Sequence, residues 1–215
     1  MLAPLARLHL VTDARPGRDP VAVVGAALAV ARNRLAVQVR VTDDTSDRDA
    51  YELAARIAAL CRDADARCLV NDRLHIAVAV GAAGGHVGDE DLPVAAARRV
   101  LGPDAVLGVT ARDPAAARRA VAAGASYLGV GPAYPTATKD GLPDPIGPAG
   151  VAAVAAAVPV PVIAISGVTP ARVPELVGAG AYGVAVVGAI GAARDPGAAT
   201  AEFLAVLAAS VGAAR

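Results

Sequence analysis

The chain has few aromatic residues and no excess of charge of either sign. Of its 215 residues, four are Tyr, one is Phe and none is Trp, while Lys plus Arg and Asp plus Glu number 20 each. Proteins that bind nucleic acids need a basic surface and often use aromatic rings for stacking. This composition therefore argues against a nucleic-acid partner, and any anion that the protein binds must be held by local groups.

Long uninterrupted hydrophobic runs are also lacking, although 55% of the residues are hydrophobic and the mean hydropathy is +0.50. The most apolar stretch, residues 151–165, is divided by Pro159 and Pro161, whereas a membrane-spanning helix needs about 20 consecutive apolar residues. The opening MLAPLARLHLVTD has no charged segment followed by an apolar one and a cleavage site. We therefore expect neither a membrane helix nor a secretory signal.

Cysteine is scarce as well. Cys61 and Cys68 lie seven positions apart, without the spacing of a zinc site or a disulfide framework. We expect two buried free thiols, as suits a cytoplasmic protein.

Short β-branched runs alternate with Ala-rich helical stretches from end to end. This pattern predicts strands at Leu8–Thr12, Ala36–Arg40, Arg67–Val70, Gly85–Gly88, Val106–Thr110, Tyr127–Gly131, Val160–Ile165 and Gly183–Val187. Eight such units favour a (β/α)8 TIM barrel, an α/β fold whose strands are buried on both faces. An open doubly wound sheet is the alternative, but no GxGxxG follows the first strand. We predict a single barrel domain, residues 1–215.

Two helix starts can also be located from the sequence. Ser46 is a plausible cap for an amphipathic helix in residues 47–64, and Asp113-Pro114 opens another helix with Pro at its first position.

Polar or small residues follow nearly every predicted strand. Because the carboxyl ends of barrel strands meet at one rim, where active sites lie, these residues are the site candidates. They are Thr12, Asp13, Gln38, Arg40, Asn71, Asp72, Asp89, Glu90, Asp91, Thr110, Thr136, Thr138, Lys139, Ser166, Gly167 and Gly188. The long loop 131–147, which contains four prolines, follows the sixth strand, and loops of this length are usually functional or disordered.

Asp72 and Asp91 follow consecutive strands, so their carboxylates could hold Mg²⁺ together with water and substrate phosphates. The alternative is that each aspartate caps the next helix. Thr136, Thr138 and Lys139 could hold phosphate oxygens, or could form a solvated turn.

Two glycine positions near the end of the chain are also open to two interpretations. The small residues at Ser166-Gly167 and Gly188 suit phosphate binding by backbone amides, or close helix–strand packing.

The three histidines offer no covalent catalysis. His9 and His75 are interpreted as structural, and His86 either as a packed core imidazole or as a group that supports the site. No Ser/His/Asp or Cys/His arrangement is visible, so no covalent nucleophile is expected.

Taken together, seven ordered segments resemble the thiamine phosphate synthase family. They are VQVR (37–40), VNDR (70–73), GHVGDEDLP (85–93), LGVT (107–110), GVGPAYPTATK (129–139), VIAISGV (162–168) and GVAVVGAI (183–190). The resemblance implies a (β/α)8 barrel that joins hydroxymethylpyrimidine diphosphate to a thiazole phosphate and releases pyrophosphate by a dissociative route.

The resemblance also implies roles for individual residues. Asp72 and Asp91 would hold Mg²⁺. The pyrimidine diphosphate would lie among Gln38, Arg40, Asn71, Thr110 and Lys139, of which Arg40 and Lys139 are the catalytic candidates. The thiazole phosphate would lie among Thr136, Thr138, Ser166, Gly167, Val187 and Gly188.

The sequence departs from the family pattern at several of these positions. The family usually reads Gln-x-Arg-Glu-Lys after the second strand, whereas residues 38–42 are QVRVT, so Val41 and Thr42 replace the acid and the lysine. Ser166 replaces the first glycine of IGGI, and Thr110 and Gly188 stand where serines are usual. These changes weaken the diphosphate side of the site.

Two other functions stay open for a barrel of this kind. A related thiazole tautomerase binds the thiazole phosphate alone, but such relatives tend to lose the two aspartates and to carry a His after strand six, and GPAY has none. A non-catalytic phosphate-binding barrel is the other alternative. The sequence leaves a homo-oligomer open.

Overall fold

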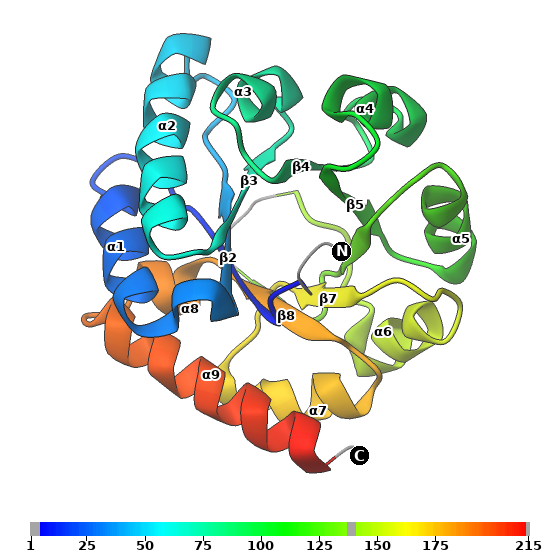
Figure 1. Ribbon diagram of the computed structural model, residues 1–215. Helices are drawn as coiled ribbons and strands as arrows, with labels where there is room; N and C mark the ends of the chain where they lie inside the picture. The colour runs from blue at the N-terminus through cyan, green and yellow to red at the C-terminus, as the bar shows by residue number, and fades with distance from the viewer. Residues whose placement is uncertain (1–4, 137–140, 214–215) are drawn as a thin grey trace.

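The computed structural model describes residues 5–136 and 141–213 and shows a closed barrel of eight parallel strands surrounded by helices (Figure 1). The strands pair in chain order, and β8 closes the sheet on β1. They are β1 Leu8–Val11, β2 Leu35–Val39, β3 Arg67–Asn71, β4 Gly84–Val87, β5 Val106–Ala111, β6 Tyr127–Val130, β7 Val162–Ile165 and β8 Gly183–Val186. The predicted TIM barrel is confirmed.

One strand begins later than its sequence indicates. The β-branched run suggested a strand from Val160, but β7 begins at Val162. Pro161 lacks a backbone N–H and cannot donate to the neighbouring strand, although its carbonyl accepts from Leu128 N at 2.9 Å.

Helices lie between the strands and form the outer ring in Figure 1. They are α1 Pro20–Ala31, α2 Asp47–Asp63, α3 Leu74–Ala79, α4 Val94–Leu101, α5 Pro114–Ala122, α6 Gly147–Ala155, α7 Val173–Gly178, α8 Gly188–Gly191 and α9 Pro196–Ala213, with 3₁₀ turns η1 Arg32–Arg34 and η2 Pro170–Arg172.

The two predicted helix starts are confirmed. The Ser46 hydroxyl accepts from Asp49 N at 3.1 Å, and Asp113 Oδ1 accepts from Ala115 N and Ala116 N at 2.8 Å each. Each side chain satisfies N–H groups that the first helical turn cannot pair internally.

The buried residues form two groups, separated by the barrel wall. A large cluster lies between the strands and the helices, and a smaller one fills the barrel interior. The buried residues of the interior cluster are Val11, Leu69, Val106, Tyr127, Ile163 and Ala185. Because strand side chains alternate between faces, this interior cluster shows which residues point inward in β1, β3, β5, β6, β7 and β8.

The two cysteines and His75 lie outside the barrel interior. Cys61 and Cys68 are buried free thiols, as expected, and hydrogen bonding with Cys68 and burial raise the pKa of Cys61. The interpretation of His75 as a structural histidine, packed in the core, is wrong. It lies on the exposed side of α3, with Nε2 3.3 Å from Asp47 Oδ2.

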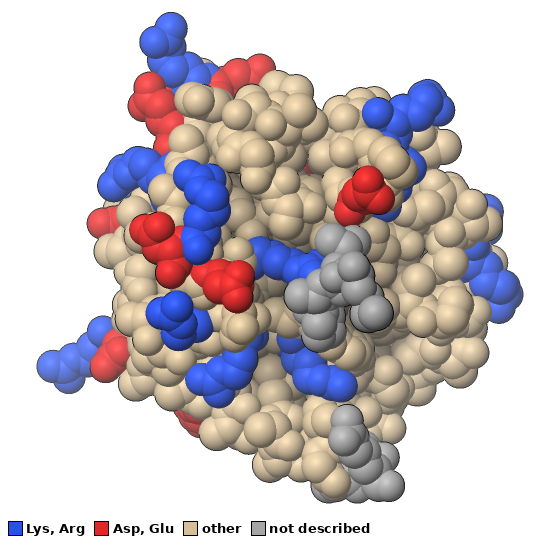
Figure 2. Space-filling view, viewed as in Figure 1, with Lys and Arg blue, Asp and Glu red and all other residues tan. Residues whose placement is uncertain are grey.

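The surface is consistent with the balanced composition. On the face seen in Figure 1, charged side chains of both signs lie side by side over α1 and α2 (Figure 2). None of the helices in the described part of the chain is both long and apolar enough to cross a membrane.

Candidate active site at the carboxyl ends of the strands

Inward-facing polar residues end several strands at the same rim of the barrel. Leu69 and Val106 belong to the interior cluster, so Asn71 and Thr110, at even spacing from them, face the same interior. Gln38, near the end of β2, is buried with only 7% of its surface exposed. The alternation of strand side chains thus places Gln38, Asn71 and Thr110 inside the barrel at one rim, and the strand order puts them on its β2–β5 side.

A direct contact joins two of these residues. Gln38 Nε2 donates to Asn71 Oδ1 at 2.5 Å, across the neighbouring strands β2 and β3. This bond fixes both side-chain amides, and leaves Gln38 Oε1 and Asn71 Nδ2 as polar groups for a ligand.

The backbone of Arg40 is held by Thr12. The Thr12 hydroxyl donates to Arg40 O and accepts from Arg40 N, both at 2.8 Å. The half-buried Arg40 side chain has no hydrogen bond or ion pair with any residue that the structure describes. Arg40 therefore brings an unpaired cation to the rim, which suits a bound phosphate.

Asp72 and Asp91 follow the adjacent strands β3 and β4. Asp72 is exposed and has φ 62°, and its N–H donates to His86 O at 2.8 Å, which ties its loop to β4. Asp91 is half-buried, and its Oδ2 accepts from Gly88 N at 2.6 Å. The capping alternative is wrong for both aspartates, because Arg73 and Pro93 occupy the N-cap positions of α3 and α4 without side-chain caps.

The donor set at this rim fits a magnesium ion better than a metal held by protein alone. Within residues 5–136 and 141–213, no group of three or more His, Cys, Asp or Glu side chains could hold a metal ion. Two carboxylates are enough for Mg²⁺, which keeps several waters and takes further oxygens from substrate phosphates. Asp72 and Asp91 are the residues that could hold it.

A line of hydrogen-bonded side chains lies beneath Thr110. The Tyr127 hydroxyl is 3.0 Å from His86 Nδ1, and His86 Nε2 is 3.0 Å from Thr110 Oγ1. His86 is buried, and burial lowers its pKa to about 4. Because His86 contacts Thr110 at the rim, its hydrogen bonds favour the second interpretation, in which it supports the site.

The opposite side of the rim is built largely from backbone. Ala133 N donates to Ile165 O at 2.8 Å and Tyr134 N donates to Ser166 O at 3.1 Å, so the loop after β6 runs beside the residues after β7. Thr136 directly follows this segment, which lies beside Ser166 and Gly167.

Two residues with a left-handed backbone conformation shape this side of the rim. Gly167 has φ 64°, and a Cβ there would lie 2.6 Å from Pro135 O and 2.7 Å from Tyr134 Cβ, so only glycine fits. Ser166 has φ 76°, a conformation that is strained for a residue with a side chain. The glycine usual in the family would adopt it without that strain.

Val187 and Gly188 complete this side at the end of β8. Gly188 begins the short helix α8, and Val187 is its N-cap. A short extra helix after strand eight is a common phosphate-binding feature of TIM barrels. Thr138 and Lys139 lie outside the described residues.

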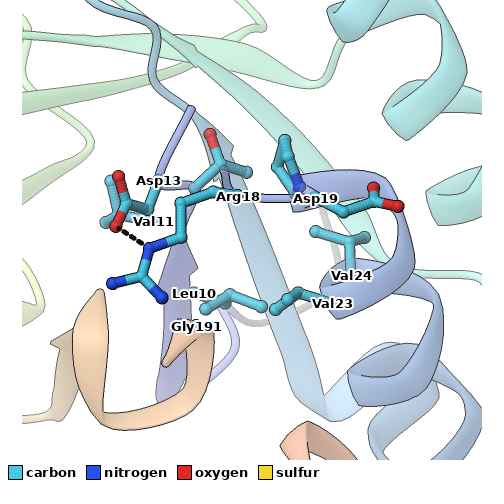
Figure 3. A pocket seen from close by; sticks show the side chains of 10 residues that line it. Leu10, Val11, Asp13, Arg18, Asp19, Val23, Val24 and Gly191 are labelled. Atoms are coloured by element: carbon cyan, nitrogen blue, oxygen red, sulfur yellow. Dashed lines mark ion pairs between the residues drawn. The ribbon is translucent and has the colours of Figure 1, made fainter. Parts of the chain in front are cut away.

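A small cavity beside the end of β1 does not contribute to the site. Its volume is about 10 Å³, enough for about one water molecule (Figure 3). In its wall, Asp13 accepts two hydrogen bonds from Arg15 at 2.7 Å, and Arg18 Nε lies 3.5 Å away. The hydrogen bond from Arg15 is the main cause that lowers the pKa of Asp13. The Asp13 carboxylate is thus already paired.

A larger hollow of about 590 Å³ lies at the other end of the barrel, beside the start of β7 and β8. Its lining is mainly Val, Pro and Ala, and it includes none of the rim residues. The hollow therefore lies apart from the candidate site at the carboxyl ends of the strands.

Sequence reasoning missed two arginines near the rim. Arg112, two residues beyond Thr110, donates from Nη2 to Asp144 O at 2.6 Å, and its buried Nε has no hydrogen-bond partner among the residues that the structure describes. Arg172 donates to Gly167 O at 2.5 Å and lies over the Tyr134 ring. The alternation that locates Thr110 also points to Arg112, whereas nothing local in the sequence pairs Arg172 with Gly167.

Comparison with known proteins agrees with this geometry. Residues 8–190 match the family described as thiamine monophosphate synthase. The thiamine-phosphate synthase of Salinispora tropica is 67% identical over 206 residues, which cover 96% of this chain and 99% of that protein. That of Haloquadratum walsbyi is 47% identical over 196 residues, covering 89% and 86%.

A solved structure gives the same result. Thiamine phosphate pyrophosphorylase from Pyrococcus furiosus is 31% identical, with a TM-score of 0.86 over 96% of this chain and 97% of that one. Sequence and fold agree along nearly the whole chain, which therefore belongs to the thiamine monophosphate synthase family.

Proposed function

We propose that this chain is a thiamine-phosphate synthase that joins a pyrimidine diphosphate to a thiazole phosphate and releases pyrophosphate. The observation that carries the proposal is the two-sided rim. One side has fixed amides and Arg40, whose side chain is unpaired within residues 5–136 and 141–213, and the other has glycine-rich backbone after β7 and β8. Two separate anion sites on one rim suit two phosphorylated substrates.

On the first side, Arg40 and Lys139 would neutralise the diphosphate as it departs, while Gln38, Asn71 and Thr110 orient it. Asp72 and Asp91 would hold Mg²⁺, which supplies positive charge to the diphosphate when bound. On the second side, Thr136, Thr138, Ser166, Gly167, Val187 and Gly188 would hold the thiazole phosphate, through hydroxyls and backbone N–H groups.

The reaction suits a site without a nucleophilic side chain. The bond between the pyrimidine methylene carbon and the diphosphate oxygen breaks, and its electron pair leaves with pyrophosphate. The lone pair of the thiazole nitrogen then forms the new C–N bond. The protein's contribution is to hold the two substrates in line and to stabilise the departing charge.

The tautomerase is the second candidate, since it needs only the thiazole side of the rim. Arg40, which has no side-chain partner among the described residues, and the paired Gln38 and Asn71 favour the synthase, because an enzyme that uses no diphosphate has no need of them. We also propose a cytoplasmic location, because Cys61 and Cys68 are free thiols.

An assay with both substrates tests these alternatives. The protein is mixed with pyrimidine diphosphate, thiazole phosphate and Mg²⁺, and products are detected by mass. Joined product together with pyrophosphate supports the synthase. Isomerised thiazole alone would indicate the tautomerase, and binding without any product would indicate a non-catalytic barrel.

A further inference from the structure

The hydrogen bonds of His86 have a direction, which Tyr127 sets. The Tyr127 side chain is 1% exposed, and in the described chain its hydroxyl has a single hydrogen-bond partner, His86 Nδ1 at 3.0 Å. A buried O–H without an acceptor is costly, and burial raises the pKa of Tyr127, so the hydroxyl keeps its proton. Tyr127 therefore donates to His86 Nδ1.

The remaining proton of the ring follows from this. A neutral imidazole carries one N–H, and when Nδ1 accepts, the proton is on Nε2. His86 Nε2 then donates to Thr110 Oγ1, 3.0 Å away. The proton of the Thr110 hydroxyl is thus free to point elsewhere, at a half-buried position near the end of β5.

The fold makes room for this pair of rings. A Cβ at Gly108 would lie 2.4 Å from His86 Nδ1 and even closer to the Tyr127 ring, and one at Gly129 would lie 2.9 Å from His86 Cε1. Gly108 is directly opposite His86 in the β4–β5 register. The His9 and Tyr127 rings also pack edge to face, with centroids 5.3 Å apart. The two glycines therefore keep open the space in which Tyr127 reaches His86.

We propose that His86 is a positioning residue that, together with Tyr127, sets the Thr110 hydroxyl as a hydrogen-bond donor toward an oxygen of the diphosphate substrate. If Thr110 instead donated to His86, its oxygen lone pairs would face the diphosphate and repel it. The proposal rests on the proposed function for the identity of the ligand, but the direction of the hydrogen bonds does not.

The tautomer can be measured without any variant at the site. In ¹⁵N-labelled wild-type protein, long-range ¹⁵N–¹H spectra distinguish a ring protonated at Nε2 from one protonated at Nδ1. The His86 signal is assigned as the one that persists in His9→Gln and His75→Gln. We expect the Nε2–H form at pH 7. The Nδ1–H form, or an equal mixture of both, would overturn the proposal.

Kinetics then test whether the arrangement serves the diphosphate. Tyr127→Phe keeps the ring and removes the hydroxyl, so we expect KM for the pyrimidine diphosphate to rise about tenfold, while KM for the thiazole phosphate changes less than about twofold. Thr110→Val should raise the same KM, and the double variant should be no worse than Thr110→Val alone. Equal rises in both KM values, or additive effects, contradict the positioning role.

A matched control is available at the opposite end of the barrel. The Tyr182 hydroxyl donates to Leu5 O at 2.7 Å, so Tyr182→Phe also removes one tyrosine hydrogen bond, and should leave both KM values unchanged.

If the wild type makes no product, the proposed function fails. The same variants are then compared by calorimetric titration with pyrophosphate and Mg²⁺. Weaker binding by Tyr127→Phe and Thr110→Val, with no change for Tyr182→Phe, supports the inference, and unchanged binding by Tyr127→Phe overturns it. If Tyr127→Phe does not fold, the His86 tautomer measured in the wild-type protein tests the proposal instead.

Discussion

Gln38 and Asn71 present their side-chain amides as one unit, because the 2.5 Å bond from Gln38 Nε2 to Asn71 Oδ1 crosses from β2 to β3. The bond uses one donor and one acceptor and leaves the Asn71 amide N–H groups available at the rim. A diphosphate is an acceptor only, so Asn71 is suited to hold it and Gln38 to orient Asn71.

Asn71→Asp separates these two roles. The new carboxylate can still accept from Gln38, but it offers no donor and adds a negative charge beside the diphosphate. We expect kcat/KM for the pyrimidine diphosphate to fall by about 10²-fold. Asn33→Asp, at an exposed position in η1, is the matched control. Steady-state kinetics that show equal losses in both variants would contradict the assignment.

The paired aspartates give a metal prediction. Asp72→Asn and Asp91→Asn each remove one negative charge at the rim, and we expect each to lower kcat by about 10²-fold or more. Excess EDTA should abolish wild-type activity, and added Mg²⁺ should restore it. Asp89→Asn, an exposed aspartate on the same loop, should retain activity. Full activity in EDTA would show that the metal assignment is wrong.

Much of this site can be predicted from the sequence because barrel strands are short, β-branched and end at one rim. The strand predicted at Tyr127–Gly131, for example, differs from β6 by one residue. The alternation of side chains then places Asn71 and Thr110. The partner of His86 could not be predicted, because its contact with Tyr127 depends on the β4–β5–β6 register and on the gap at Gly108.

His75 shows a second limit of what can be predicted from the sequence. Its neighbours in the sequence are apolar, yet it lies on the outer side of the short helix α3, where Asp47 of α2 is its partner. A helix of this length does not show which face is buried by its periodicity alone. Packing between helices, which the sequence does not reveal, decides the environment of this side chain.

The two buried histidines predict a loss of stability in acid. Burial lowers the pKa of His9 and of His86 from 6.5 to about 4. Between these values the unfolded chain binds protons that the folded chain excludes, so stability is full above pH 6.5 and falls as the pH decreases toward 4. From pH 7 to 5 we expect a loss of about 2 kcal/mol for each histidine in the free energy of unfolding.

Urea denaturation at pH 7 and pH 5 measures this loss. His9→Gln should reduce the difference between the two pH values by about half, because one of the two groups no longer titrates. Equal stability of the wild type at both pH values would contradict the prediction.

Lys139 is the sole lysine of the chain, and it follows the end of β6 by nine residues in the sequence. We expect Lys139→Ala to lower kcat by about 10²-fold, because one charge on the departing pyrophosphate is no longer neutralised. KM for the thiazole phosphate should change little. Lys139→Arg keeps the charge and should recover part of kcat. If only thiazole phosphate binding weakens, the role assigned to Lys139 is wrong.

Thr42 stands where the family usually has a lysine, and its side chain is engaged within its own loop. The Thr42 hydroxyl donates to Asp44 Oδ1 at 2.5 Å and lies 2.9 Å from Thr45 Oγ1. We expect Thr42→Lys to raise kcat by about tenfold, as one additional charge-assisted hydrogen bond would. Binding of the thiazole phosphate, on the other side of the rim, should not change.

Thr42→Ala is the matched control, because it loses the same hydroxyl contacts without gaining a cation. A rise in kcat for both variants would assign the effect to the loop rather than to the charge. No rise for Thr42→Lys in an active enzyme would mean that other cations already neutralise the pyrophosphate. Arg40 and Arg112 are the candidates, because the Arg40 side chain and the buried Arg112 Nε have no hydrogen-bond partner in the described part of the chain. Arg40→Gln in the Thr42→Lys background should then lower kcat less than Arg40→Gln alone, because the new lysine replaces part of the missing charge.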